Sequence, residues 1–293
     1  MTNYQTGILM EPVPKHARYL YLSLSANTDY ARVLQAISGI SSFPRTVVGI
    51  GTQLLETYEK SIPGLTAFPR FSGANVDIPS TPRALWCWMG ADDRGELIHN
   101  TLRVRSMLEP VFKIEQLVDA FQYLDNRDLS GYIDGTENPG NEEARDAAIV
   151  NGMGAGLDGS SFVAVQQWVH NLNYMSSLPQ NEQDNIIGRR ISDNEEIDDA
   201  PFSAHVKRTA QESFSPEAFV VRRSMPWADS SREGLIFVAF GKSFDAFEAL
   251  LKRMAGVEDD IADALFQFTQ PVTGSYFWCP PVIDGKLDLS ALM

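Results

Sequence analysis

The hydrophobic pattern predicts two similar strand–helix units, one near each end of the chain. Residues 18–25 alternate apolar and polar side chains with a period of two, which is typical of a strand, and a helical pattern follows over 28–37. Residues 234–240 form a continuous apolar strand, and a helix with apolar residues at i, i+3 and i+4 follows over 243–254. Gly256 stands where a C-cap would end that helix. Two α+β halves are therefore expected.

Other segments extend this pattern. Strands are expected at 84–89 and 161–169, and a helix over 114–124. The stretch 182–200 crowds Asp, Glu and Asn together, so we expect a solvated acidic loop there.

Composition and charge exclude several classes of protein. With 293 residues, of which 44% are hydrophobic, the chain can bury a large core. No apolar run approaches the roughly 20 residues of a membrane-spanning helix, so no membrane partner is expected. The 24 Lys and Arg against 38 Asp and Glu give a net charge of −14, which disfavours nucleic acid as a partner. The same charge mildly disfavours anionic dyes at the surface.

The cysteines and the start of the sequence predict a cytoplasmic protein. Residues 1–11 lack the basic and apolar regions of a secretory signal. Cys87 and Cys279 are too few for a disulfide framework or a cysteine metal site. Each stands in an aromatic run, so both are interpreted as small buried apolar residues in a reducing compartment.

The segment 126–140 carries the most chemical information, and it has more than one interpretation. Counted from Asn126, it places Asp128, Ser130 and Glu137 at positions 3, 5 and 12 of a calcium-binding EF-hand loop. A neutral first position and the helix-breaking Pro139 count against calcium. On local chemistry alone, the Asp-Gly pair within the segment is typical of a turn.

The sequence Gly-Tyr-Ile-Asp-Gly-Thr-Glu-Asn-Pro at 131–139 resembles the GxxDG signature, extended to GxxDGTxNP, of the dye-decolorizing haem peroxidases. Further segments resemble the family in the family's order. They are 161–170, 187–190, the region of His205, 221–226 and 234–281. Within this family, the sequence is most similar to the bacterial class B (P-type) group.

The resemblance implies an α+β fold made of two ferredoxin-like halves with antiparallel sheets, of the dimeric α+β barrel type. The N-terminal ferredoxin-like domain would be residues 1–130, and the C-terminal domain, residues 131–293, would bind the haem. A homo-oligomer, dimer or higher, is implied as well. The sequence stops soon after the last family segment, so no tail that targets a protein nanocompartment is expected.

The resemblance also implies the site residues around haem b. His205 would be the proximal ligand of the iron, and Asp263 would bond the far nitrogen of its imidazole. On the opposite face Asp134 would carry the peroxide proton, and Arg222 would supply a fixed positive charge. Ser224, two residues beyond Arg222, would share its strand face and take part in catalysis.

Further cofactor contacts are implied at Gly135 and Thr136 of the motif and at Arg189. Arg189 resembles a haem-propionate partner, and a surface ion pair with the neighbouring acidic segment is an equal alternative. The three other histidines, at 16, 99 and 170, are interpreted as structural residues.

The implied activity is that of a haem peroxidase. Hydrogen peroxide would oxidise bulky organic reductants, phenolics or dyes, through a ferryl porphyrin radical. An alternative uses the same pocket for haem binding or iron release without peroxidase turnover. The calcium module at 126–137 is the third possibility. Five Trp and nine Tyr offer routes for electrons, and the sequence does not rank them.

Overall fold

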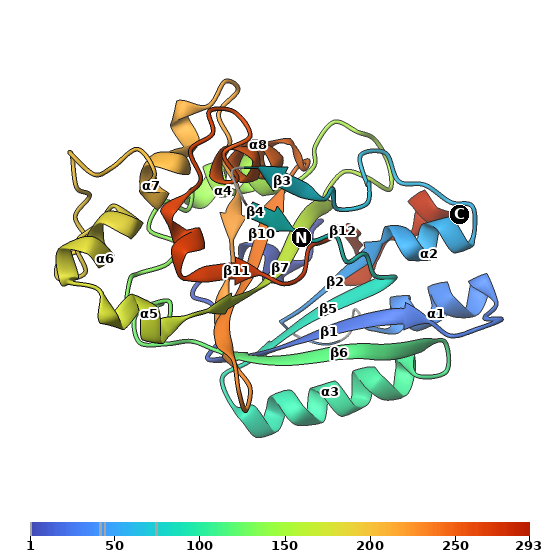
Figure 1. Ribbon diagram of the computed structural model, residues 1–293. Coiled ribbons are helices and arrows are strands. Elements are labelled where there is room, and N and C mark those ends of the chain that lie inside the picture. The colour runs from blue at the N-terminus through green and yellow to red at the C-terminus, as the bar shows by residue number, and fades with distance from the viewer. Residues whose placement is uncertain (1, 41–42, 44, 74–75) are drawn as a thin grey trace.

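A closed ring of antiparallel strands forms the centre of the computed structural model, which describes residues 2–40, 43, 45–73 and 76–293. Eight strands follow one another around the ring in the order β7-β12-β2-β5-β1-β6-β9-β10, and β10 pairs with β7 to close it (Figure 1). Their bounds are β1 His16–Leu24, β2 Thr46–Gly51, β5 Leu85–Ala91, β6 Phe112–Phe121, β7 Ser161–His170, β9 Met225–Ala228, β10 Glu233–Gly241 and β12 Ser275–Cys279.

The two halves of the chain each contribute four neighbouring strands to this ring. Strands β2, β5, β1 and β6 come from the first half, and β9, β10, β7 and β12 come from the second. The halves join at the pairs β12–β2 and β6–β9. The expected α+β fold of the dimeric barrel type with antiparallel sheets is thus confirmed, while the exact domain bounds, 1–130 and 131–293, stay a prediction.

Short strands complete the sheet structure of the described residues. β8 (Val221–Arg222) pairs with β10, and β11 (Thr269–Pro271) pairs with β7, both outside the ring. Two small hairpins lie apart from the barrel. They are β3 (Phe71–Gly73) with β4 (Val76–Ile78), and β13 (Val282–Ile283) with β14 (Lys286–Leu287).

Aromatic side chains fill the barrel. Because alternate residues of a strand face opposite sides, Tyr19, Trp86 and Trp88 point inward together and are at most 1% exposed. Tyr19 stacks on Trp88 with ring centroids 6.4 Å apart, and Trp86 stacks on Phe277 at 5.8 Å. The interior is therefore a packed core and not a channel.

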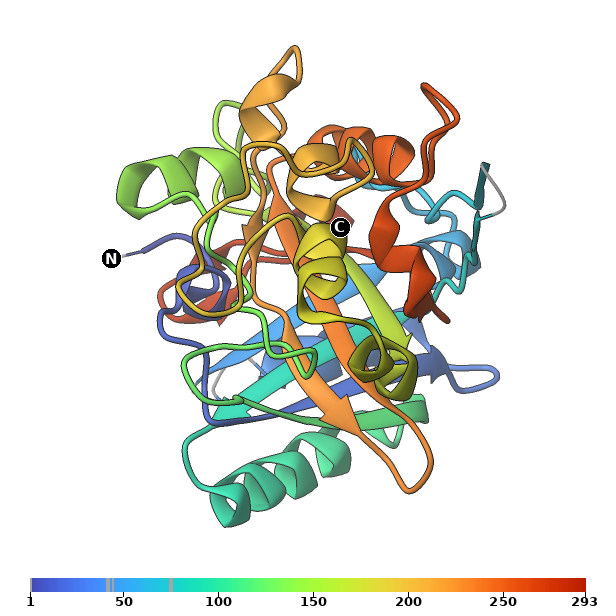
Figure 2. The same ribbon diagram turned by 60° about the vertical axis from the view of Figure 1, so that its left-hand side comes forward.

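Helices cover the outer face of the barrel in two groups (Figures 1 and 2). One group lies beside the strands of the first half: α1 (Tyr30–Ile40), α2 (Thr52–Thr57) and α3 (Arg94–Leu108). The other group lies beside the strands of the second half: α4 (Asn141–Ala148), α5 (Leu172–Ser177), α6 (Gln180–Ile187), α7 (His205–Arg208) and α8 (Asp245–Met254). Four 3-10 turns complete the described elements: η1 (Thr6–Leu9), η2 (Gln211–Ser213), η3 (Ala264–Gln267) and η4 (Ser290–Leu292).

Most of the predicted elements are confirmed, and one is wrong. The predicted strands correspond to β1, β5, β7 and β10, and the predicted helices correspond to α1 and α8. Gly256 has φ +69° and donates its N–H to the carbonyl of Arg253, as a helix end requires. The helix expected over 114–124 is instead strand β6, which pairs with β1 along its length. The fifteen-residue helix α3, capped by the side chain of Asp93, was not predicted.

Two further expectations can be compared with the structure. Cys87 and Cys279 are both buried free thiols, as their aromatic surroundings indicate. In the segment 182–200, the first residues belong to α6, and the rest, beyond Gly188, is an exposed loop. Within the described ranges, no helix has the length and the apolarity needed to span a membrane.

Candidate active site

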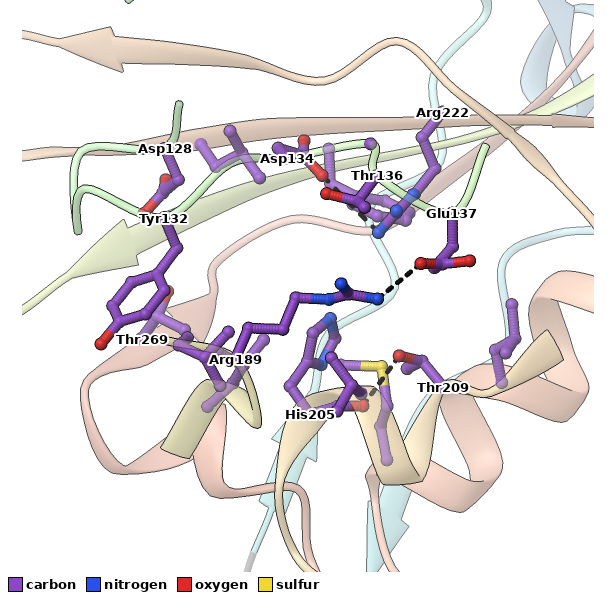
Figure 3. A pocket seen from close by; sticks show the side chains of 18 of the residues that line it. Asp128, Tyr132, Asp134, Thr136, Glu137, Arg189, His205, Thr209, Arg222 and Thr269 are labelled. Atoms are coloured by element: carbon purple, nitrogen blue, oxygen red, sulfur yellow. Dashed lines mark hydrogen bonds and ion pairs between the residues drawn. The ribbon is translucent and has the colours of Figure 1, made fainter. Parts of the chain in front are cut away.

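A cavity of about 220 Å³ lies on the outer face of strands β7 and β10, between these strands and helices α7 and α8 (Figure 3). Strand alternation explains one wall, because in the second half of β7 the residues that do not face the barrel face this cavity. Gln166, Trp168 and His170 occupy these positions. The wall formed by β10 and α8 is apolar: Leu235, Phe237, Phe247, Leu250, Leu251 and Met254.

His205 begins helix α7 and lines the lower side of this cavity (Figure 3). Its Nδ1 lies 2.8 Å from Oδ2 of Asp263, whose side chain is fully buried. The other oxygen of Asp263 accepts the N–H of Leu265 at 2.8 Å, so the carboxylate is held on both sides. A carboxylate only accepts, and therefore Nδ1 of His205 carries the proton.

That tautomer leaves the Nε2 lone pair of His205 available. No described residue bonds this nitrogen, and 21% of the side chain is exposed, toward the cavity. An imidazole oriented by a carboxylate on one nitrogen, with the other free in an apolar cavity, is the arrangement of a metal or haem ligand. These residues fit an iron porphyrin.

Asp134 and Arg222 lie across the cavity from His205 (Figure 3). Nη1 of Arg222 is 3.5 Å from Oδ1 of Asp134, and the two side chains are 19% and 17% exposed. Asp134 stands in a loop whose glycines, Gly131 and Gly135, have φ of +94° and +83°, a region that favours glycine. The predicted proton carrier and the predicted cation are thus brought together on the face opposite His205.

Asn138, the Asn of the GxxDGTxNP motif, fixes this loop to strand β8. Its Nδ2 donates to the carbonyl of Arg222 at 3.0 Å, and its Oδ1 accepts the N–H of Arg222 at 2.9 Å. Both bonds go to the main chain of residue 222, so they set the distance between the loop and the strand independently of the side chain at that position. The sequence analysis did not single out Asn138, although its place in the motif was a signal.

Ser224 does not line this cavity. Strand β8 ends at Arg222 and β9 begins at Met225, so the expected alternation between Arg222 and Ser224 does not hold. Ser224 is 4% exposed, and its Oγ accepts the N–H of Val238 at 3.3 Å. It lines a neighbouring cavity, which Asp134 and Arg222 also reach.

The remaining predicted contacts lie at the edge of the main cavity. Arg189 lines the cavity and pairs with Glu137 at 2.5 Å and Glu196 at 3.5 Å, so the surface ion pair is present and the propionate contact stays a prediction. Thr136 accepts a hydrogen bond from Nδ2 of Asn194 at 3.1 Å.

His170 is a hydrogen-bonded residue in the cavity wall that the sequence analysis treated only as structural. Its Nε2 lies 2.9 Å from Oδ2 of Asp128, and its Nδ1 lies 2.6 Å from Oγ1 of Thr269. The Thr269 hydroxyl also contacts the carbonyl of Val169 at 3.2 Å. Burial raises the pKa of Asp128, but the hydrogen bonds of His170 and Ser130 and the charge interaction with His170 together outweigh it and lower that pKa. The Asp128 carboxylate and the His170 ring are thus held together inside the cavity wall.

The calcium interpretation of 126–137 finds no support. The loop is entered from strand β6 and not from a helix. Asp128 binds His170, and Glu137 binds Arg189, so two of the carboxylates required for calcium have other partners. Among the residues that the structure describes, no group of three or more His, Cys, Asp or Glu could hold a metal ion.

The barrel and the cavity together define a protein of the dimeric α+β-barrel class with a ligand pocket on its second half. Residues 125–284 match the family model of the Dyp-type peroxidase, C-terminal domain. The chain belongs to the Dyp-type peroxidase family, whose members are peroxidases, and it is itself such an enzyme.

Relatives with known names and structures agree with this assignment. The dye-decolorizing peroxidase of Rhodococcus erythropolis is 29% identical, over 93% of this chain and 85% of that protein. A putative dyp-type peroxidase from Shewanella oneidensis has a TM-score of 0.89 at 27% identity, covering 96% of this chain and 97% of that one. An arginine-to-leucine variant of DypB from Rhodococcus jostii RHA1, in complex with heme, has a TM-score of 0.84 at 26% identity, covering 93% and 94%.

Proposed function

We propose that the protein is a haem b peroxidase that uses hydrogen peroxide to oxidise bulky organic reductants such as phenolics and dyes. The observation that carries the proposal is the His205 imidazole, bonded through Nδ1 to buried Asp263 and presenting a free Nε2 to an apolar cavity. The heme complexes of DypB, which has the same fold, support haem as the cofactor.

Several residues of this chain would hold the haem. His205 would bind the iron, and Asp263 would keep its imidazole in one tautomer and increase its electron donation. The apolar side chains of β10 and α8 would pack on the porphyrin, and Arg189 would bind a propionate in exchange for Glu137 and Glu196. When bound, haem supplies the iron at which peroxide is reduced.

The opposite face would handle protons and charge. Asp134 offers carboxylate oxygens that can accept a proton from peroxide and return it to the departing oxygen. Arg222, 3.5 Å away, supplies positive charge without competing for that proton, because a guanidinium stays protonated. The main-chain bonds of Asn138 hold the two at this separation.

An absorption spectrum of the haem-loaded protein, before and after one equivalent of hydrogen peroxide, tests the proposal. We expect a Soret band that shifts on addition of peroxide. His205→Ala should weaken the haem complex, with partial rescue by added imidazole, whereas His99→Ala, an exposed residue of α3, should leave it unchanged. A wild-type protein that takes up no haem would contradict the proposal.

Two variants, Asp134→Asn and Arg222→Leu, distinguish the peroxidase from the alternative, which is haem handling without peroxidase turnover. If the protein is a peroxidase, each change lowers the rate of the peroxide reaction by about 10²-fold or more while haem affinity stays near that of the wild type. Peroxide rates that are unchanged in both variants would favour haem handling. A cytoplasmic location and a homo-oligomeric state remain predictions.

A further inference from the structure

Arg223 is one of two buried arginines among the residues that the structure describes, and its charge has few partners. The residue is 2% exposed and directly follows strand β8. Its Nη1 donates to the carbonyl of Arg222 at 2.9 Å and lies 3.3 Å from Oε1 of Glu11. Its Nε is buried and has no hydrogen-bond partner in the described part of the chain. Burial lowers the pKa of Arg223, and the charge and hydrogen bond of Glu11 offset this only in part. The guanidinium, which stays protonated at neutral pH, is therefore incompletely neutralised.

Arg208, the other buried arginine, shows how this fold neutralises such a charge. Its Nη1 and Nη2 each donate to a carboxylate oxygen of Asp259 at 2.7 Å. Its Nε also donates to the carbonyl of Arg253 at 3.2 Å. Two parallel bonds to one carboxylate are the strong form of this contact. Arg223 has a single, longer contact with a carboxylate, and the Glu11 side chain is 62% exposed. Because Glu11 is largely hydrated already, it can leave Arg223 at little cost.

The cavity that Ser224 lines provides room for another anion beside Arg223. Its volume is about 390 Å³, and Arg223 and Glu11 both belong to its wall. The charged residues of this wall, within the described ranges, are two acids and two arginines: Glu11, Asp134, Arg222 and Arg223. Asp134 pairs with Arg222 at 3.5 Å, so the wall is neutral while Glu11 stays on Arg223. If Glu11 turns to solvent, one positive charge is left over. A monovalent anion would balance it.

The donors in this wall favour an anion with two oxygens. Oγ of Ser224 accepts the N–H of Val238 at 3.3 Å, and its own proton has no acceptor among the residues that the structure describes. That hydroxyl can therefore donate to a ligand. The guanidinium of Arg223, next to it in the sequence, offers further N–H groups in one plane. Two donors on different side chains match the separate oxygens of a carboxylate better than a single spherical ion.

We propose that Arg223 and Ser224 form a binding site for a small monovalent oxyanion of the carboxylate type, which takes the place of Glu11. The oxyanion accepts hydrogen bonds from the guanidinium and from the Ser224 hydroxyl, while the Glu11 carboxylate turns to solvent. The ligand is then held in a cavity that Asp134 and Arg222 also reach. The inference goes beyond the proposed peroxidase function and does not depend on it.

Binding of acetate to the haem-free full chain tests this site, because acetate is a small carboxylate and no iron is present to bind it. Saturation-transfer NMR of the acetate methyl group measures the affinity at pH 7 and constant ionic strength. We expect saturable binding of acetate and no binding of acetamide, its neutral analogue. Arg223→Gln should weaken the binding at least tenfold, and Ser224→Ala at least threefold. Equal affinities in wild type and Arg223→Gln would overturn the inference.

Glu11→Gln tests the exchange with a variant that leaves the protein core unchanged, because this side chain is exposed. The neutral amide competes less for Arg223 and does not repel acetate, so we expect binding at least threefold tighter than in wild type. Glu59→Gln is the matched control, since it removes the same charge from an exposed residue that does not line this cavity. It should leave the affinity unchanged. Binding that is no tighter in Glu11→Gln than in Glu59→Gln refutes the exchange, even if Arg223→Gln does not fold.

A second measurement separates this site from the porphyrin pocket. The titration is repeated on protein loaded with zinc protoporphyrin, a diamagnetic substitute for haem, and the acetate affinity should stay within twofold. Loss of acetate binding on loading would overturn the inference, because acetate would then have occupied the place of a porphyrin carboxylate. A protein that takes up no porphyrin would count against the proposed function alone, while the haem-free titrations would still decide on the anion site.

Discussion

Replacement of Asp128 by Asn should destabilise the protein, because it removes the charge of a buried carboxylate that is hydrogen-bonded to His170. The His170 side chain is 4% exposed and that of Asp128 is 14% exposed, so little water reaches this bond. A hydrogen bond to a charged group contributes about 1.5–3 kcal/mol. The neutral amide forfeits most of that contribution, and we therefore expect a loss of about 3 kcal/mol.

Urea unfolding at pH 7 measures this loss directly, and thermal unfolding should show it as a decrease in Tm of roughly 6 °C, at about 2 °C per kcal/mol for a large domain. Asp125→Asn is the matched control. Asp125 pairs with Arg127 at 2.7 Å, but its side chain is 58% exposed, so little or no loss of stability is expected.

The loss should also depend on pH in a definite direction. Because folding lowers the pKa of Asp128, its stabilisation is present above the pKa of an unfolded Asp, about 3.9, and disappears as the pH falls through the lower folded value. The gap between wild type and Asp128→Asn should be complete at pH 6 and shrink below about pH 4. A gap below 1 kcal/mol at pH 7, or one that stays constant down to pH 3, would refute the stabilising bond between the Asp128 carboxylate and His170.

Three further predictions concern the cofactor ligand, the thiols and the barrel. Asp263→Asn should speed haem loss from His205, measured by transfer to apomyoglobin, and a transfer rate equal to that of wild type would contradict its role. Burial raises the pKa of Cys87 to about 12, so its thiol should stay unreactive toward Ellman's reagent at pH 8 until urea unfolds the protein. Gly234→Ala should cost several kcal/mol in urea unfolding, because a Cβ there would overlap the carbonyl of β7, whereas Gly140→Ala, which meets nothing within 4 Å, should be near neutral.

The success of the strand predictions has a physical basis. Strands β1, β5, β7 and β10 are buried along most of their length, so apolar side chains fill or alternate along them. The prediction for strand β6 was wrong because several of its apolar side chains are exposed. Leu117 and Phe121 stand four apart with Leu124 three further on, which is helical spacing, yet Leu117 is 40% exposed and Leu124 is 68% exposed. The apolar pattern there does not describe a buried face.

Closure of the barrel could not be predicted from any single segment. It depends on the pairing of Phe277 with Gly51 and of Ala120 with Trp227, residues more than a hundred positions apart in the sequence. Pairing over such separations follows from the packing of the whole core. The resemblance to a known family supplied what local periodicity could not.

In the candidate site, too, the family resemblance and the local pattern had different outcomes. His205, Asp263, Asp134 and Arg222 were assigned through the family resemblance. The structure brings His205, Asp134 and Arg222 to two faces of one cavity and places Asp263 behind His205. Ser224 was placed by assuming a continuous strand, and the end of β8 at Arg222 removes that assumption. The alternation of side chains predicts their directions only within the strand itself.

The position of Asp134 shows why the rest of the site lies beyond local sequence reasoning. Its loop is held at one end by the pair of Asp128 with His170 of β7 and at the other by the bonds of Asn138 to the main chain of β8. Between them, Nδ2 of Asn126 donates to the carbonyl of Asp134 itself at 2.9 Å. Two of these anchors lie on strands remote in sequence, β7 of the barrel and β8 beside it, so the carboxylate is positioned by the assembled sheet. A change at His170 should therefore reach the reaction through Asp134 without any contact between the two.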